Sequence, residues 1–139
     1  MTTFIICIDD NNGTLFNHRR QSRDQVLFEK IKELCAGTPL TVSPYTAKLL
    51  SQTLPDVSLN IVDHPEQSKR EFCFLEDTAA LAVPEACDRI VLFHWNRNYP
   101  HDTVFDKEGF LKNGHFFLDE TQTFPGKSHE EILMEVFEK

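Results

Sequence analysis

The side chain best placed to do chemistry in this sequence is Asp24, which opens the segment DQVLFEKI directly after a basic loop. A carboxylate at a helix start, packed by apolar neighbours, can pair with the N–H edge of a heterocycle or deliver a proton where burial raises its pKa. We therefore predict that Asp24 is a catalytic residue and that Ile5 and Phe28 pack against the ligand. The competing interpretation is an acid that stabilises its helix through the macrodipole or through Arg20 and Arg23.

Positive charge is concentrated just before this acid. Arg19, Arg20 and Arg23 fall close together, in a chain that otherwise has more acidic than basic residues. We expect Arg20 and Arg23 to contribute to substrate binding. A solvated basic turn explains the same residues equally well.

A second candidate region begins at Ser43-Pro44, where a capping serine precedes a proline suited to a first helical turn. A helix N-terminus with nearby hydroxyl groups suits a phosphate. We predict that Ser43 and Thr46 bind a cofactor and that Tyr45 binds the substrate. Capping alone also explains Ser43.

Two acids, Glu76 and Asp77, follow an apolar segment of strand length. Acids at a strand end can hold an amine or a metal ion, and we place Glu76 among the cofactor-binding residues. The alternative is a solvated acidic turn.

The cysteines and histidines are widely spaced. No two of the four cysteines form a C-x-x-C pair, which indicates reduced thiols rather than a zinc ribbon or a redox site. His94, His101 and His115 match no metal-binding spacing. We predict no metal site.

Hydrophobic periodicity predicts strands alternating with helices. The expected order is a strand over 5–8, a helix from Asp24 to near Gly37, a strand over 40–42, a helix over 44–53, strands over 59–62 and 72–75, a helix over 78–86 interrupted by Pro84, a strand over 89–95, a long loop over 96–109 and a strand over 115–118.

The last segment, SHEEILMEVFEK, fits two structures. Ser128 and Glu131 form a capping box, which favours a helix. The spacing of Ile132, Met134 and Val136 instead suits one face of a strand. We favour the helix.

These patterns predict an α/β fold for residues 1–139, organised as a single domain with a mostly parallel sheet of about six strands flanked by helices. A net charge of -8 disfavours general nucleic-acid or anionic-membrane binding. No apolar run approaches the ~20 residues that span a bilayer. We expect a cytoplasmic protein with a small-molecule ligand, and the sequence leaves the ligand's identity and the oligomeric state open.

Several strings resemble dihydrofolate reductase. IICIDDNNG resembles that family's first strand and mobile-loop glycine, DQVLFEKI the helix that carries its substrate acid, and TPLTVSPYTAKLL and LPDVSLNIV its following strand, cofactor-side helix and next strand. EACDRIVLFHWNRNYPHDTVF resembles its later strand and its aspartate-threonine-x-phenylalanine motif, here Asp102, Thr103 and Phe105. The resemblance implies a dihydrofolate reductase-like fold, with Asp24 at the acid and Phe28 at the ring-packing position.

The sequence departs from that family at positions with chemical roles. Leu75, Glu76 and Asp77 stand where the family places glycines against the cofactor phosphates, and two carboxylates there repel phosphate. Val57 stands in the place of the arginine that holds the folate tail, and Phe93 in that of the threonine bonded to the catalytic acid.

Three functions follow from these observations. The first is a reductase-like domain that binds a heterocycle or nucleotide, with NADPH as the cofactor that the resemblance implies. The second is a non-catalytic regulatory or interaction module that has lost the cofactor site, an interpretation that the missing glycines favour. The third, which we rank last, is a metal-dependent hydrolase or nuclease.

Overall fold

Strand β1 (Thr2–Ile8) is buried along nearly its whole length and forms the middle of the main sheet. The computed structural model describes residues 2–79, 81–82 and 85–139. The seven strands of this sheet have the order β5-β4-β6-β1-β7-β10-β9. Their bounds are Leu59–Ile61 for β5, Leu40–Val42 for β4, Phe72–Phe74 for β6, Cys87–His94 for β7, Ile132–Glu138 for β10 and Phe117–Phe124 for β9.

The sheet is parallel on one side and antiparallel on the other. Strand β1 pairs in parallel with β6 and β7, and β4 pairs in parallel with β5 and β6. Strand β10 runs antiparallel to both β7 and β9. The predicted single-domain α/β fold with a mostly parallel sheet is thus confirmed, with one strand more than the six expected.

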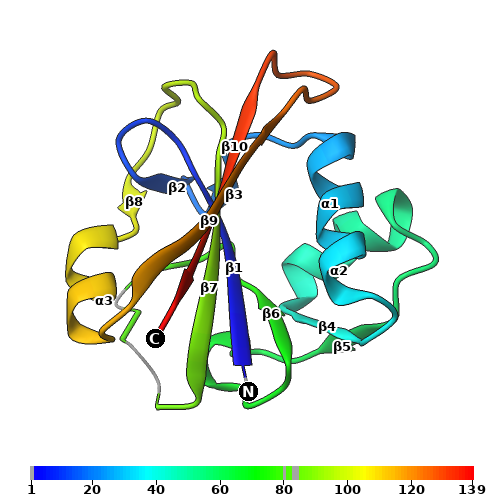
Figure 1. Cartoon of the computed structure of the whole chain (residues 1–139). Helices are drawn as coiled ribbons and strands as arrows, with labels where there is room; N and C mark the ends of the chain where they lie inside the picture. Colours follow the sequence, from blue (N-terminus) through cyan, green and yellow to red (C-terminus); the bar gives the residue numbers. More distant parts are fainter. Residues whose placement is uncertain (1, 80, 83–84) are drawn as a thin grey trace.

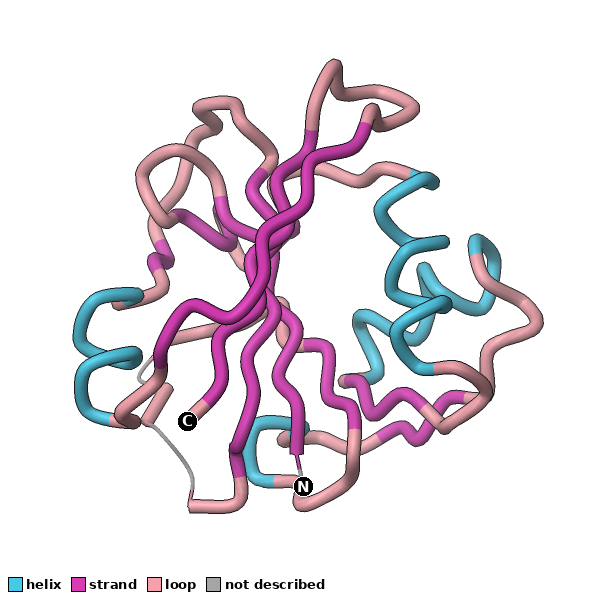
Figure 2. Tube along the Cα trace, in the orientation of Figure 1, coloured by secondary structure: helices cyan, strands magenta, loops and turns pink. Residues whose placement is uncertain are grey.

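Helices cover both faces of this sheet (Figure 1). Helices α1 (Gln25–Cys35) and α2 (Pro44–Thr53) pack on one face, where Leu27, Phe28 and Leu50 join its buried cluster. Helix α3 (Lys107–Asn113) packs on the other through Phe110. Figure 2 shows the twisted sheet passing between these helices. Because β1 is covered on both faces, it reads as a continuous apolar run in the sequence.

The predicted C-terminal helix is wrong, because residues 132–138 form strand β10. Ile132, Met134 and Val136 are buried in the core on one face of that strand. Hydrogen-bonded ladders to β7 and β9 satisfy its backbone on both sides. Ser128 Oγ does not cap a helix but contacts Asp24 and the carbonyl of Arg23. Tertiary pairing therefore overrides the local helical signal.

Four smaller differences lie around this core. A second sheet of the order β3-β2-β8 joins Arg19–Arg20, Gly13–Phe16 and Thr103–Val104. Helix α3 begins within the region expected to be a long loop, and the strand expected over 115–118 runs from Phe117 to Phe124. The helix expected over 78–86 does not form at the positions described there, while positions 80 and 83–84 lie outside the described residues.

The described helices are short. None of them is long and apolar enough to cross a membrane.

Candidate functional site

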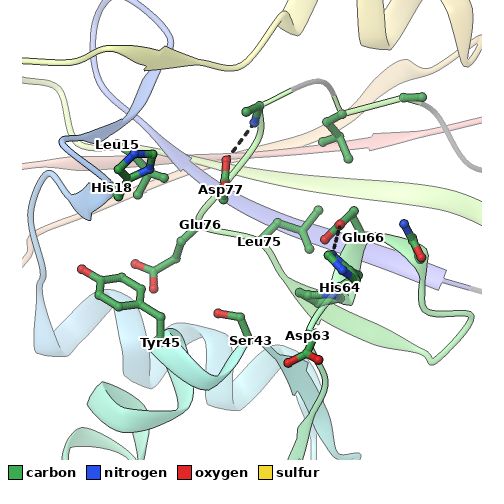
Figure 3. A pocket seen from close by; sticks show the side chains of 15 residues that line it. Leu15, His18, Ser43, Tyr45, Asp63, His64, Glu66, Leu75, Glu76 and Asp77 are labelled. Carbon is green, nitrogen blue, oxygen red and sulfur yellow. Dashed lines mark hydrogen bonds and ion pairs between the residues drawn. The ribbon is translucent and has the colours of Figure 1, made fainter.

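The described residues form a groove of about 750 Å³ (Figure 3). It lies beyond the carboxyl ends of β4 and β6, the position where open α/β sheets usually bind ligands. Figure 3 shows Glu76 and Tyr45 on one side of the groove and His64 and Glu66 on the other. Its full lining is Leu15, His18, Ser43, Tyr45, Asp63, His64, Pro65, Glu66, Gln67, Leu75, Glu76, Asp77, Ala79, Leu81 and Ala82.

One wall of the groove is held together by an ion pair between Arg20 and Glu76. The Arg20 Nε and Nη2 atoms donate to the two Glu76 carboxylate oxygens at 2.8 and 2.9 Å. Thr46 Oγ1 donates to Glu76 Oε1 at 2.7 Å, and the Arg20 guanidinium lies 4.3 Å from the centre of the Tyr45 ring. Burial by itself lowers the pKa of Arg20, but the Glu76 hydrogen bonds and charge raise it above its usual value. Arg20 therefore stays charged and neutralises Glu76.

The rest of the groove is acidic. Asp63, Glu66 and Asp77 line it together with His18 and His64, and the described lining contains no lysine or arginine. His64 Nδ1 lies 3.3 Å from Glu66 Oε1. An acidic wall attracts cations and N–H donors and repels phosphate.

Asp24 lies outside this groove, at the N-terminus of α1. Its Oδ1 accepts hydrogen bonds from the backbone N–H groups of Val26, Leu27 and Lys127, at 2.9, 3.4 and 2.9 Å. Its Oδ2 contacts Ser128 N at 2.8 Å, Ser128 Oγ at 3.1 Å and His129 Nδ1 at 2.9 Å. A Cβ atom on Gly126 would lie 2.6 Å from this Oδ2, so glycine is required for the close approach. The carboxylate is buried, and both of its oxygens are hydrogen-bonded.

These contacts determine the protonation state of Asp24. Burial by itself raises the pKa of this carboxyl, but the hydrogen bonds from Lys127, His129 and Ser128 outweigh burial and hold the pKa well below its usual range. A permanently ionised carboxylate is a poor proton donor near neutral pH.

A comparison with solved structures identifies the architecture. The chain superposes on dihydrofolate reductase from Enterococcus faecalis, a structure complexed with NADP(H) and RAB-propyl, with a TM-score of 0.68. The superposition covers 99% of this chain and 95% of that chain, at 11% sequence identity. The chain has a dihydrofolate reductase-like fold. No family model and no curated protein matches the sequence.

Within this dihydrofolate reductase-like fold, the predicted cofactor and substrate residues divide into two groups. The structure brings Arg20, Ser43, Tyr45, Thr46 and Glu76 together at the groove. Ser43 Oγ also accepts from Thr46 N at 3.3 Å, so it caps α2 as well as lining the groove. These five side chains lie together at the groove, and their role in binding stays a prediction.

The second group lies away from the groove. Ile5 and Phe28 are buried in the core, with Phe28 on the wall of a small hollow of about 10 Å³. Arg23 is exposed. The contacts of Asp24 favour the interpretation of a helix-start acid, and its catalytic role stays a prediction.

Several residues that line the groove were not predicted from the sequence. His18, Asp63 and His64 line the groove from turns and loops, and Glu66 lines it from the short 3₁₀ helix Pro65–Gln67, positions where such polar residues are ordinary. Within residues 2–79, 81–82 and 85–139, no three His, Cys, Asp or Glu side chains are grouped so that they could hold a metal ion.

Proposed function

We propose that this protein binds a small heterocyclic or nucleotide ligand in the groove between α2 and the end of β6. The groove itself is the observation that supports the proposal, since about 750 Å³ lies within the range of small-molecule sites. Leu15 and Leu75 supply apolar surface, and Ser43 and Tyr45 supply hydroxyl groups. An apolar wall with a few polar groups is typical of such sites.

The charge of the groove favours one kind of ligand. Glu76 is neutralised by Arg20, but Asp63, Glu66 and Asp77 remain as acidic groups around the opening. A heterocycle that carries a positive charge or several N–H donors suits this lining better than a dinucleotide with its phosphates.

If the protein is an enzyme, we propose that it carries out a residual NADPH-dependent reduction. The likeness to a reductase complexed with NADP(H) supports it, as does the α2 N-terminus, where Ser43 and Thr46 supply hydroxyl groups beside the positive end of the helix dipole. In that case NADPH would lie in the groove, and its substrate would have to enter the small hollow beside Phe28.

A non-catalytic regulatory or interaction module is the alternative. Leu75 and Glu76 line both the groove and the small hollow, so the Arg20–Glu76 pair stands between them. Hydride transfer requires the two reacting molecules to approach to about 3–3.5 Å. An ion pair that stands between the two spaces favours binding without reduction.

Thermal unfolding with two probes separates these functions. We expect 2,4-diaminopyrimidine, a small heterocycle with an amidine edge, to raise the melting temperature. A ligand at about 100-fold excess over its Kd adds roughly 2.7 kcal/mol to the free energy of unfolding. NADPH is the second probe, and oxidation of NADPH in the presence of dihydrofolate would support the reductase.

A pair of variants locates the binding. Asp77→Asn removes a carboxylate from the groove and should weaken diaminopyrimidine binding, whereas Asp119→Asn on the exposed strand β9 should leave it unchanged. Stabilisation by neither probe, at concentrations up to their solubility, would contradict the proposed groove ligand.

A further inference from the structure

The guanidinium group of Arg20 is held at Glu76 in the way that a bound ligand is held. Its Nε and Nη2 atoms donate to Glu76 Oε2 and Oε1 at 2.8 and 2.9 Å, the pair of bonds typical of a guanidinium on a carboxylate. The same group lies 4.3 Å from the centre of the Tyr45 ring, and an aromatic face attracts a planar cation. Carboxylate and ring thus form a site for a planar cation, which the chain's own arginine fills.

Contacts other than the Arg20 side chain hold both halves of this site in place. Thr46 Oγ1 donates to Glu76 Oε1 at 2.7 Å, and the Glu76 side chain is only 11% exposed. The Tyr45 hydroxyl accepts a hydrogen bond from the backbone N–H of Arg20 at 3.1 Å, and strand pairing with Leu15 holds that backbone. The carboxylate and the ring therefore keep their positions when the guanidinium moves away.

Both halves of the site are open to the groove. Glu76 and Tyr45 line it, and Figure 3 shows their side chains on the same side. Tyr45 is 43% exposed, and Asp77 adds a second carboxylate to the same lining. A cation in the groove can therefore reach the position that Arg20 holds.

A second planar cation cannot pair with both oxygens of Glu76 while Arg20 remains there. A carboxylate oxygen has two lone pairs, and those of Oε1 are taken by Thr46 and Arg20. Oε2 accepts one bond from Arg20, which leaves a single acceptor position. Two parallel bonds from a ligand therefore require Arg20 to leave.

The displaced arginine has a place to go. Arg20 lines an open surface hollow of about 510 Å³, whose other lining residues are Phe16, Asn17, Arg19, Gln21, Tyr99 and Pro100. A guanidinium group that turns into this hollow is hydrated, so it needs no new carboxylate partner.

We propose that the groove ligand carries a planar amidinium or guanidinium group, which displaces Arg20 from Glu76 and stacks on Tyr45. Arg20 is then an autoinhibitory contact, which keeps out ligands that cannot supply both the charge and the two hydrogen bonds. This proposal rests on the groove being a small-molecule site, and it adds the chemical group by which the ligand is recognised.

Chemical rescue tests the site itself. Arg20→Ala leaves the shielded Glu76 carboxylate unpaired, which destabilises the protein. Methylguanidinium chloride at millimolar concentrations should then raise the melting temperature of Arg20→Ala, because it restores both hydrogen bonds and the ring contact. Methylammonium chloride is the matched probe, since it has the same charge but no planar fork, and it should raise the melting temperature less.

Three control proteins locate the rescue. The wild-type protein and Arg19→Ala, which removes the exposed neighbouring arginine, should show no shift with methylguanidinium. Arg20→Ala combined with Glu76→Gln should lose the shift. Equal shifts with the two salts in Arg20→Ala, or a shift that persists with Glu76→Gln, would overturn the proposal.

Binding of 2,4-diaminopyrimidine, whose protonated form presents an amidinium edge, tests the displacement in a milder variant. Arg20→Gln keeps an amide donor for Glu76 but removes the competing cation. We expect calorimetry to show that Arg20→Gln binds this probe about 10-fold more tightly than the wild-type protein does, because a hydrogen bond to a charged group is worth at least that factor. Adding Glu76→Gln should remove the gain.

The same titrations separate this proposal from the groove ligand on which it rests. Equal affinity of Arg20→Gln and the wild-type protein for diaminopyrimidine would overturn the displacement of Arg20 and would leave the groove ligand in place. Binding to neither protein would overturn both.

Discussion

The Oδ1 atom of Asp24 lies 2.9 Å from the backbone nitrogen of Lys127, a contact that joins the start of α1 to the loop before β10. Asp24→Ala removes the acceptor of this N–H and of the Ser128 N–H, and leaves both without a partner. We expect the free energy of unfolding to fall by about 3–5 kcal/mol. Urea denaturation measures the loss, and Asp119→Ala on the exposed β9 should change it by less than about 0.5 kcal/mol. A loss below about 1 kcal/mol in Asp24→Ala would contradict this anchoring role.

Acid should destabilise the protein through the same residue. An unfolded aspartate takes up a proton near pH 3.9, whereas the hydrogen bonds in the folded state hold the pKa of Asp24 well below that value. The unfolded state therefore binds more protons as the pH falls below about 4, and the free energy of unfolding decreases. We expect Asp24→Asn to start less stable at pH 7 but to lose less between pH 5 and pH 3. Equal losses in the two proteins would exclude Asp24 as the cause.

The Arg20–Glu76 pair should contribute more to stability than an exposed pair. Both side chains are largely shielded, and two hydrogen bonds join them. In a double-mutant cycle with Arg20→Gln and Glu76→Gln, we expect a coupling energy of about 1–2 kcal/mol. The matched control is the exposed pair of Lys32 and Asp56, 3.8 Å apart, for which we expect less than about 0.5 kcal/mol. Equal coupling in the two cycles would contradict the structural role of the groove wall.

The cysteines should be unreactive in the folded protein. Burial raises the pKa of Cys35, Cys73 and Cys87 to about 11 each. The Cys7 pKa is also raised by burial, so all four thiols stay protonated at pH 8. We expect reaction with an aromatic disulfide reagent to be at least about 100-fold slower in buffer than in urea. Rapid modification of even one equivalent in the native protein would disprove this prediction.

Local patterns in the sequence were sufficient for most elements of the fold. The strands that became β1, β4, β6 and β7 read as apolar runs because the sheet is covered on both faces. Helix α1 was predicted from its apolar spacing and from Asp24, which indeed caps it. Local strings also predict the dihydrofolate reductase-like fold, and the superposition confirms it.

The final segment and the region of α3 were wrongly predicted because their local signals favoured other structures. The final segment fits a helix or a strand by spacing alone, and the ladders of β10 to β7 and β9 decide for the strand. Helix α3 is only seven residues long and lies among residues typical of loops. It forms where Asp106 caps it and where Phe110 packs against Phe4, Phe105 and Phe116.

The sequence by itself determined which segments become buried strands and helices, and it identified the charged and hydroxyl side chains that now meet at the groove. Only the tertiary structure decided how those side chains are used. It paired Arg20 with Glu76 across 56 positions and placed His129 between Asp24 and Ser22 across 105 and 107 positions. Periodicity reports the burial of one segment at a time, whereas a site depends on distances between segments, which are determined only when the sheet assembles.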